Sequence, residues 1–159
     1  MNVFQNQDIT RIARYLPHCQ PMLMVDIIDY IDDENVDTSF EIKPSTLFVE
    51  NDFFTEAGLI ENAAQTCSAI VGQHYFFDDN KQEIENVKVV GFISAIKKIE
   101  IFSLPKVHTV IKTKAKLDSK FMSDDYQICT LQIEIFNDNE LTLRGIMNLF
   151  LQKTEDEKI

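Results

Sequence analysis

Hydrophobic and polar residues follow two different periods along this chain, and the change of period separates strand-forming from helix-forming segments. Residues 35–43 alternate strictly, with apolar residues or threonine at the even positions and polar residues at the odd ones. A period of two is typical of a strand with one buried face. The apolar run Met22–Tyr30 predicts a buried strand before it, and the polar residues 32–35 join the two strands as a hairpin.

A helical period follows the irregular stretch 44–52. The spacing of apolar and small residues predicts a helix over Thr55–Tyr75, with Thr55 as N-cap and Glu56 in the favourable first turn. A second, short helix is predicted over residues 8–16, capped by Asp8 and ended by Pro17.

The second half of the chain reads as strands. They are expected at Val87–Ser94, Ala95–Ser103, Val107–Leu117, Tyr126–Phe136 and Leu141–Gln152, before a charged tail over 154–159. One long helix among about six or seven strands indicates an α+β fold in which an antiparallel sheet curls around the helix. The length of 159 residues fits a single domain over 1–159.

Composition narrows the classes of partner and site. A net charge of −11 argues against nucleic acid or an anionic membrane, because both need basic patches. Three widely spaced cysteines without a CxxC pair predict neither a disulfide framework nor a metal site. With no nucleotide-binding glycine motif, no cofactor is expected. The absence of a signal-like N-terminus and of a long apolar run predicts a cytoplasmic protein.

Two residues stand out as candidates for proton transfer. Glu61 lies among apolar and small residues of the predicted helix, where burial favours the protonated form of a carboxylic acid. His18 lies between Pro17 and Pro21 on a stiff stretch of backbone, and its ring exchanges protons near neutral pH. Together they supply an acid and a base.

The order of these segments resembles the hot-dog fold 3-hydroxyacyl-(acyl carrier protein) dehydratases of fatty-acid synthesis. Residues 17–26, PHCQPMLMVD, are similar to the LPHRYPFLLVDR strand of that family, and residues 58–65, GLIENAAQ, to its PGVLxxEAxAQ helix. Residues 91–98 resemble its FAGIDKARF strand. The PHxxPM opening also looks like the divergent branch of these dehydratases from aryl-polyene and flexirubin pigment clusters.

The resemblance implies a reaction and a set of roles. It places Glu61 on the catalytic carboxylate of the family and Gln65 on its conserved amide, and His18 becomes the candidate base. Free N–H groups near Gly58 and Leu59, at the positive end of the helix dipole, would polarise the thioester carbonyl. Dehydration of a 3-hydroxyacyl thioester to a trans-2-enoyl thioester would follow, with the acyl chain carried on the phosphopantetheine arm of an acyl carrier protein.

One departure from the family pattern keeps two alternatives open. The catalytic histidine of the family lies in a GHFPG loop, and the corresponding position here is Leu47. A hot-dog thioesterase would use Glu61 to activate water and would need no histidine base. Alternatively, the chain is a non-catalytic or half-catalytic subunit of a heteromeric dehydratase. A homodimer or heterodimer is expected, joined edge to edge at Val87–Phe92.

Overall fold

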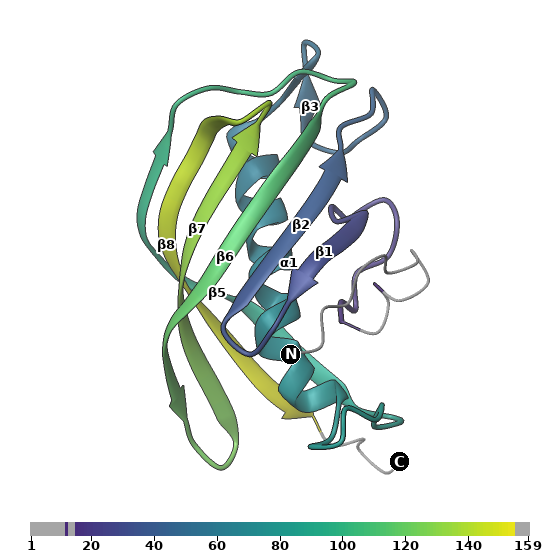
Figure 1. Ribbon diagram of the computed structural model, residues 1–159, viewed down its shortest axis with the longest axis vertical. Helices are drawn as coiled ribbons and strands as arrows, with labels where there is room; N and C mark the ends of the chain where they lie inside the picture. The colour runs from purple at the N-terminus through teal and green to yellow at the C-terminus, as the bar shows by residue number, and fades with distance from the viewer. Residues whose placement is uncertain (1–11, 13–14, 155–159) are drawn as a thin grey trace.

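The computed structural model describes residue 12 and residues 15–154. The predicted N-terminal helix over 8–16 and the tail over 154–159 fall largely outside this part of the chain. Within it, a six-stranded antiparallel sheet wraps around one long helix, which lies behind the sheet in Figure 1. This arrangement confirms the predicted α+β, hot-dog fold.

The sheet runs in the order β1-β2-β6-β7-β8-β5, and each neighbouring pair is antiparallel. Its strands are β1 (Ile27–Ile31), β2 (Asn35–Glu41), β5 (Lys88–Ile101), β6 (Val110–Met122), β7 (Tyr126–Asn137) and β8 (Glu140–Thr154). The two predicted strands over 87–103 are therefore one, because β5 pairs with β8 throughout and absorbs two register irregularities without a turn. Strand β5 is an edge strand, as the sequence predicted for its first residues.

Helix α1 spans Glu56–Phe76, one residue beyond the predicted end. Thr55 is its N-cap residue, but the Thr55 side chain makes no capping hydrogen bond, so the predicted side-chain cap is wrong. The helix buries a nearly continuous set of small and apolar side chains against the sheet, including Leu59, Cys67 and Ile70. No helix in the described part of the chain is long and apolar enough to cross a membrane.

The predicted strand over Met22–Tyr30 is shorter in the structure, because residues 22–26 leave the sheet. The ladder between β1 and β2 continues only as far as the Asp26 N–H, which donates to Ser39 O at 3.0 Å. The main chain at Met24 is instead bonded by two side chains of α1, Asn62 and Gln65. The apolar run thus packs on the helix and not beside another strand.

A short hairpin precedes the helix, in a stretch that was predicted to be irregular up to residue 52. It consists of β3 (Val49–Glu50) and β4 (Phe53–Phe54). Its two turn residues, Asn51 and Asp52, have φ angles of 49° and 68°, a region that these residue types tolerate. The hairpin places the fully buried Phe54 ring against the first turn of α1.

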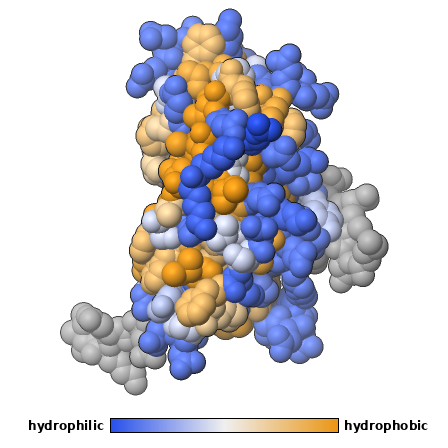
Figure 2. Space-filling model, turned by 90° about the vertical axis from the view of Figure 1, so that its left-hand side faces the viewer, coloured by the Kyte–Doolittle hydropathy of each residue, from blue (hydrophilic) through white to orange (hydrophobic). Residues whose placement is uncertain are grey.

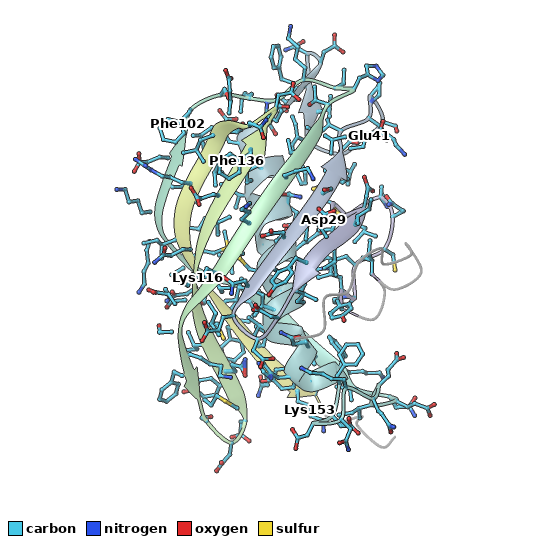
Figure 3. The ribbon with its side chains drawn as sticks, viewed as in Figure 1. Asp29, Glu41, Phe102, Lys116, Phe136 and Lys153 are labelled. Atoms are coloured by element: carbon cyan, nitrogen blue, oxygen red, sulfur yellow. The ribbon has the colours of Figure 1, made fainter. Side chains whose placement is uncertain are left out.

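Charged residues cover the face of the sheet that is turned away from α1. On β6 the exposed residues Lys112, Lys114 and Lys116 alternate with the buried Ile111, Thr113 and Ala115. Figure 3 labels Lys116 together with Asp29 on β1 and Glu41 on β2, all of them exposed residues of this sheet. The two faces of the sheet are therefore chemically distinct, and the inner face is the one that meets the helix.

Candidate active site

The two candidate proton-transfer residues meet within one chain. Glu61 lies in the second turn of α1, and His18 lies in the segment of residues 17–24, hereafter the His18 segment, which packs on that helix. His18 Nε2 and Glu61 Oε1 are 4.0 Å apart, and the two side chains are 29% and 27% exposed. Both groups are thus partly desolvated and still accessible from outside, as proton exchange with a substrate requires.

Gln65 fixes the position of the Glu61 carboxylate. Its Nε2 donates to Glu61 Oε1 at 2.8 Å and to Met22 O at 2.8 Å. Its Oε1 accepts the Met24 N–H at 2.7 Å. With 1% exposure, Gln65 is a buried connection between the carboxylate and the His18 segment.

The surroundings of His18 favour its neutral form. Burial lowers the pKa of His18 below its ordinary value of 6.5, and the nearby Glu61 carboxylate opposes that effect only in part. The Nδ1 atom of His18 is buried without a hydrogen-bond partner among the described residues. The other ring nitrogen, Nε2, is the one that faces Glu61. A neutral imidazole at physiological pH is the form that can accept a proton.

Asn62 joins the same segment to the sheet, and sequence reasoning missed it. This fully buried residue donates from Nδ2 to Met24 O at 2.7 Å. Its Oδ1 accepts the Thr113 hydroxyl of β6 at 2.6 Å. The signal in the sequence was an amide directly after Glu61 on a helix otherwise lined by small and apolar residues, where a buried polar group needs a partner.

The start of α1 differs from the expectation of two free amides. The Leu59 N–H donates to Thr55 O at 3.0 Å, so the predicted free amide at Leu59 is wrong. At Gly58 a Cβ would lie 2.3 Å from Phe54 Cε2, so this glycine admits the Phe54 ring. The Gly58 N–H is one of the first N–H groups of the helix, which have no acceptor within the helix. That this N–H binds the substrate carbonyl stays a prediction.

A separate depression of about 760 Å³ lies on the outer face of the sheet and does not include His18 or Glu61. Its lining includes Glu100, whose carboxylate pairs with Lys98 at 2.9 Å and Arg144 at 3.2 Å. The Glu100 carboxylate is therefore already neutralised by the two cationic side chains beside it. The chemistry that fits proton transfer therefore lies on the helix side of the sheet.

Comparison with known proteins gives one matching family and several structures of similar fold. The family model described as ApeP-like, ApeP dehydratase, matches residues 10–159. No curated protein matches. Among solved structures, a chain of the dehydratase heterocomplex ApeI:P from Xenorhabdus doucetiae has a TM-score of 0.72 at 16% identity, with 91% of each chain covered.

Two further structures show that the fold extends beyond dehydratases. A hypothetical thioesterase with coenzyme A from Streptococcus pneumoniae TIGR4 has a TM-score of 0.57 at 13% identity, covering 82% of this chain and 88% of the other. The virulence protein Cj0977 from Campylobacter jejuni has a TM-score of 0.64 at 12% identity, with 99% of each chain covered. At these identities the likeness concerns the fold.

Proposed function

We propose that this chain, which belongs to the ApeP-like dehydratase family, dehydrates 3-hydroxyacyl thioesters to trans-2-enoyl thioesters, with His18 as base and Glu61 as acid. The observation that carries the proposal is the 4.0 Å approach of His18 Nε2 to Glu61 Oε1. A base and an acid at this separation can reach the C2 proton and the C3 hydroxyl of adjacent carbon atoms in one bound substrate.

The proton balance of the reaction follows from this pair. In the reactive protonation state His18 is neutral and Glu61 is protonated: His18 accepts the C2 proton, and Glu61 gives its proton to the C3 hydroxyl, which leaves as water. The double bond forms between C2 and C3. The site then holds an imidazolium and a carboxylate, and transfer of one proton from His18 to Glu61, relayed by a water molecule across the 4.0 Å between them, restores both groups. No other reactant is consumed.

The thioester carbonyl needs a hydrogen-bond donor while negative charge develops on its oxygen. The Gly58 N–H supplies it, at the end of α1 where the helix dipole is positive. Leu59 and Gln65 complete the site in other ways. Leu59 is fully buried in the core and its N–H is already bonded, so it supports the start of the helix from the core side, and Gln65 orients the Glu61 carboxylate.

An assay that follows two products tests this function against thioester hydrolysis. The purified protein is incubated with a 3-hydroxyacyl thioester and, separately, with a saturated acyl thioester, each on acyl carrier protein and on coenzyme A. The expected result is an enoyl product without free thiol, with the carrier-protein substrate preferred. Release of thiol without any enoyl product would replace this proposal by a thioesterase that uses Glu61 to activate water.

A heteromeric form of the same function is favoured by the edge of the sheet. Strand β5 exposes Val90, Phe92 and Ile96 at 49%, 54% and 47%. Figure 2 shows the side of the molecule that carries this edge, where hydrophobic residues form a band flanked by hydrophilic ones. An unpaired apolar edge is an aggregation hazard unless another subunit covers it. The similar Xenorhabdus chain comes from the dehydratase heterocomplex ApeI:P.

The second subunit would be a related hot-dog dehydratase that pairs along β5. Such a subunit supplies the histidine of the loop in which this chain has Leu47. If that subunit is basic, it also offsets the net charge of −11 of this chain. That charge repels an acidic carrier protein, so a basic partner would speed its encounter with the site.

Purifying the chain alone, measuring its oligomeric state and assaying His18→Ala separates the two forms. Activity of the chain alone that collapses in His18→Ala supports the self-sufficient homodimer. Inactivity that is relieved only by adding a second dehydratase subunit supports the heteromer. Full activity of His18→Ala would remove His18 from the mechanism.

A further inference from the structure

The His18 segment is attached to the helix by hydrogen bonds of a kind usually supplied by a neighbouring strand. Met24 donates its N–H to Gln65 Oε1 at 2.7 Å and accepts Asn62 Nδ2 on its C=O at 2.7 Å. Two amide side chains, three residues apart on α1, thus satisfy both polar groups of one buried peptide residue. The position of the segment relative to Glu61 depends on these two side chains.

The Asn62 side chain is oriented by a hydrogen bond from the sheet. The Thr113 hydroxyl donates to Asn62 Oδ1 at 2.6 Å, which leaves Asn62 Nδ2 directed at Met24 O. Thr113 lies on β6, in the centre of the sheet, and is 1% exposed. The chain of contacts therefore runs from a rigid strand through Asn62 to the backbone six residues after His18.

We infer that Asn62, oriented by Thr113, is a positioning residue for the proposed dehydration, because it anchors the His18 segment beside Glu61, where His18 Nε2 and Glu61 Oε1, 4.0 Å apart, can act on one bound substrate. The inference rests on the proposed function and adds to it a residue that touches neither substrate nor the reacting atoms. Its action is transmitted through the Met24 carbonyl. Small displacements of a catalytic group have large kinetic effects, so a buried anchor matters for rate as well as for folding.

The chain contains a matched control for this anchor. Thr66 on α1 and Thr38 on β2 form another buried side-chain bond between helix and sheet, with their hydroxyl oxygens 2.8 Å apart. Both residues are as buried as Asn62 and Thr113, and Thr38 is the direct cross-strand partner of Thr113. Neither hydroxyl is bonded to the His18 segment. Removing this pair changes core polarity alone.

The test compares the double variant Asn62→Leu/Thr113→Val with Thr38→Val/Thr66→Val. Each removes both members of a bonded polar pair, and the first variant also takes away the donor to Met24 O, which is the anchor under test. We expect kcat to fall by about 10- to 100-fold in the first variant, with KM changed less than twofold. The control should retain kcat within about twofold. Thr113→Ser, which keeps the hydroxyl, should recover most of the activity that Thr113→Val loses.

A second readout is independent of activity. Burial lowers the pKa of His18, and Glu61 is the charged group that opposes this effect among the described residues. Release of the segment exposes the imidazole, so its titration followed by NMR should move toward 6.5 in the anchor variant and stay unchanged in the control. If the pKa of His18 changes in both variants, or in neither, the inference is overturned.

The two readouts also separate this inference from the proposed function. A wild-type protein that dehydrates no 3-hydroxyacyl thioester, with or without a partner subunit, refutes the proposed function, and the His18 titration still decides the anchor. Equal losses of kcat in the anchor variant and in the control would show that Asn62 and Thr113 serve the fold only.

Discussion

Glu61 and Glu100 are the same residue type at nearly the same exposure, 27% and 31% of the side chain, and they have opposite surroundings. Glu100 lies on the outer face of the sheet between Lys98 and Arg144, at 2.9 and 3.2 Å. Hydrogen bonds from these two cations lower the pKa of Glu100. Glu61 faces an imidazole at 4.0 Å and a neutral amide at 2.8 Å, and no Lys or Arg pairs with it among the described residues.

This difference in partners is the reason why we propose Glu61, and not Glu100, as the acid. A carboxylate between two permanent cations is held in its charged form and has no proton to give near neutral pH. Glu61 has no such cation beside it among the described residues and faces the His18 ring instead. The exposed fractions of the two side chains do not distinguish Glu61 from Glu100, whereas the groups in contact with each carboxylate do.

The largest expected effect comes from removing each carboxylate in turn. Glu61→Gln should lower kcat for 3-hydroxyacyl thioester dehydration by about 10²- to 10⁴-fold, the usual contribution of an acid catalyst. Glu100→Gln should leave kcat unchanged, since Glu100 lies on the other side of the sheet. Steady-state kinetics of both variants measures this. Wild-type activity in Glu61→Gln would remove Glu61 from the site.

The next effect concerns the amide that holds Glu61. Gln65→Leu removes its bonds to Glu61, Met22 and Met24, and it leaves the buried Met24 N–H without its acceptor. We expect a loss of about 1–3 kcal/mol in the free energy of unfolding and at least a tenfold fall in kcat. Urea unfolding and kinetics measure the two quantities.

Gln127 provides the control for that substitution. It is equally buried at 1% exposure, but among the residues that the structure describes its side chain makes a single weak hydrogen bond, from Nε2 to Cys129 Sγ at 3.5 Å. Gln127→Leu should cost less stability and leave kcat unchanged. If both variants lost activity equally, Gln65 would be one more buried glutamine, and its contact with Glu61 would have no part in the rate.

A smaller effect is expected in the titration of His18. Its pKa lies below 6.5, so kcat/KM should fall as the pH falls through that lower value and the base becomes protonated. The unfolded chain takes up this proton near 6.5, before the native chain does. The contribution of neutral His18 to stability is therefore present above 6.5 and lost as the pH falls from 6.5 toward the native value.

The two carboxylates should act differently on this titration. Glu61 raises the pKa of His18 against the effect of burial, so Glu61→Gln should lower that pKa further. Glu100→Gln should leave it where it is. NMR titration of the imidazole in the three proteins checks both expectations, and a His18 pKa that is indifferent to Glu61 would contradict the contact on which the pair depends.

The sequence predicted the sheet and the long helix because these depend on local pattern, and residue type singled out His18 and Glu61 as candidates. Alternating residues in 35–43 form β2, and the helical period from Thr55 becomes α1. The sequence could not show that residues 22–26 leave the sheet. The groups that bond Met24 are side chains 38 and 41 residues away, and their pattern in the sequence is only that of two polar helix residues.

The same reason explains what was missed at the site. Asn62 looked like an ordinary polar position, because its two partners come from the His18 segment and from β6. Gly58 was expected to offer a free N–H, and the sequence could not show that the Phe54 ring of the preceding hairpin occupies the space of a side chain there. In each case the deciding contact is made by a residue that local periodicity does not place.

The smallest expected effect is on stability, from breaking the exposed ion pair between Arg144 and Glu100. Exposed ion pairs contribute little to stability, because water and salt screen them. Arg144→Leu should therefore change the urea midpoint of unfolding far less than Gln65→Leu does, and the change should vanish in 1 M NaCl, where the screening length is about 3 Å. It should also leave kcat and the His18 titration untouched. A salt-independent loss of stability would mean that Arg144 acts through its packing over the Phe102 ring, 5.5 Å from the guanidinium carbon, and not through Glu100. A loss of kcat would mean that the two faces of the sheet are coupled, and the separation of the carboxylates by their partners would no longer explain which one is the acid.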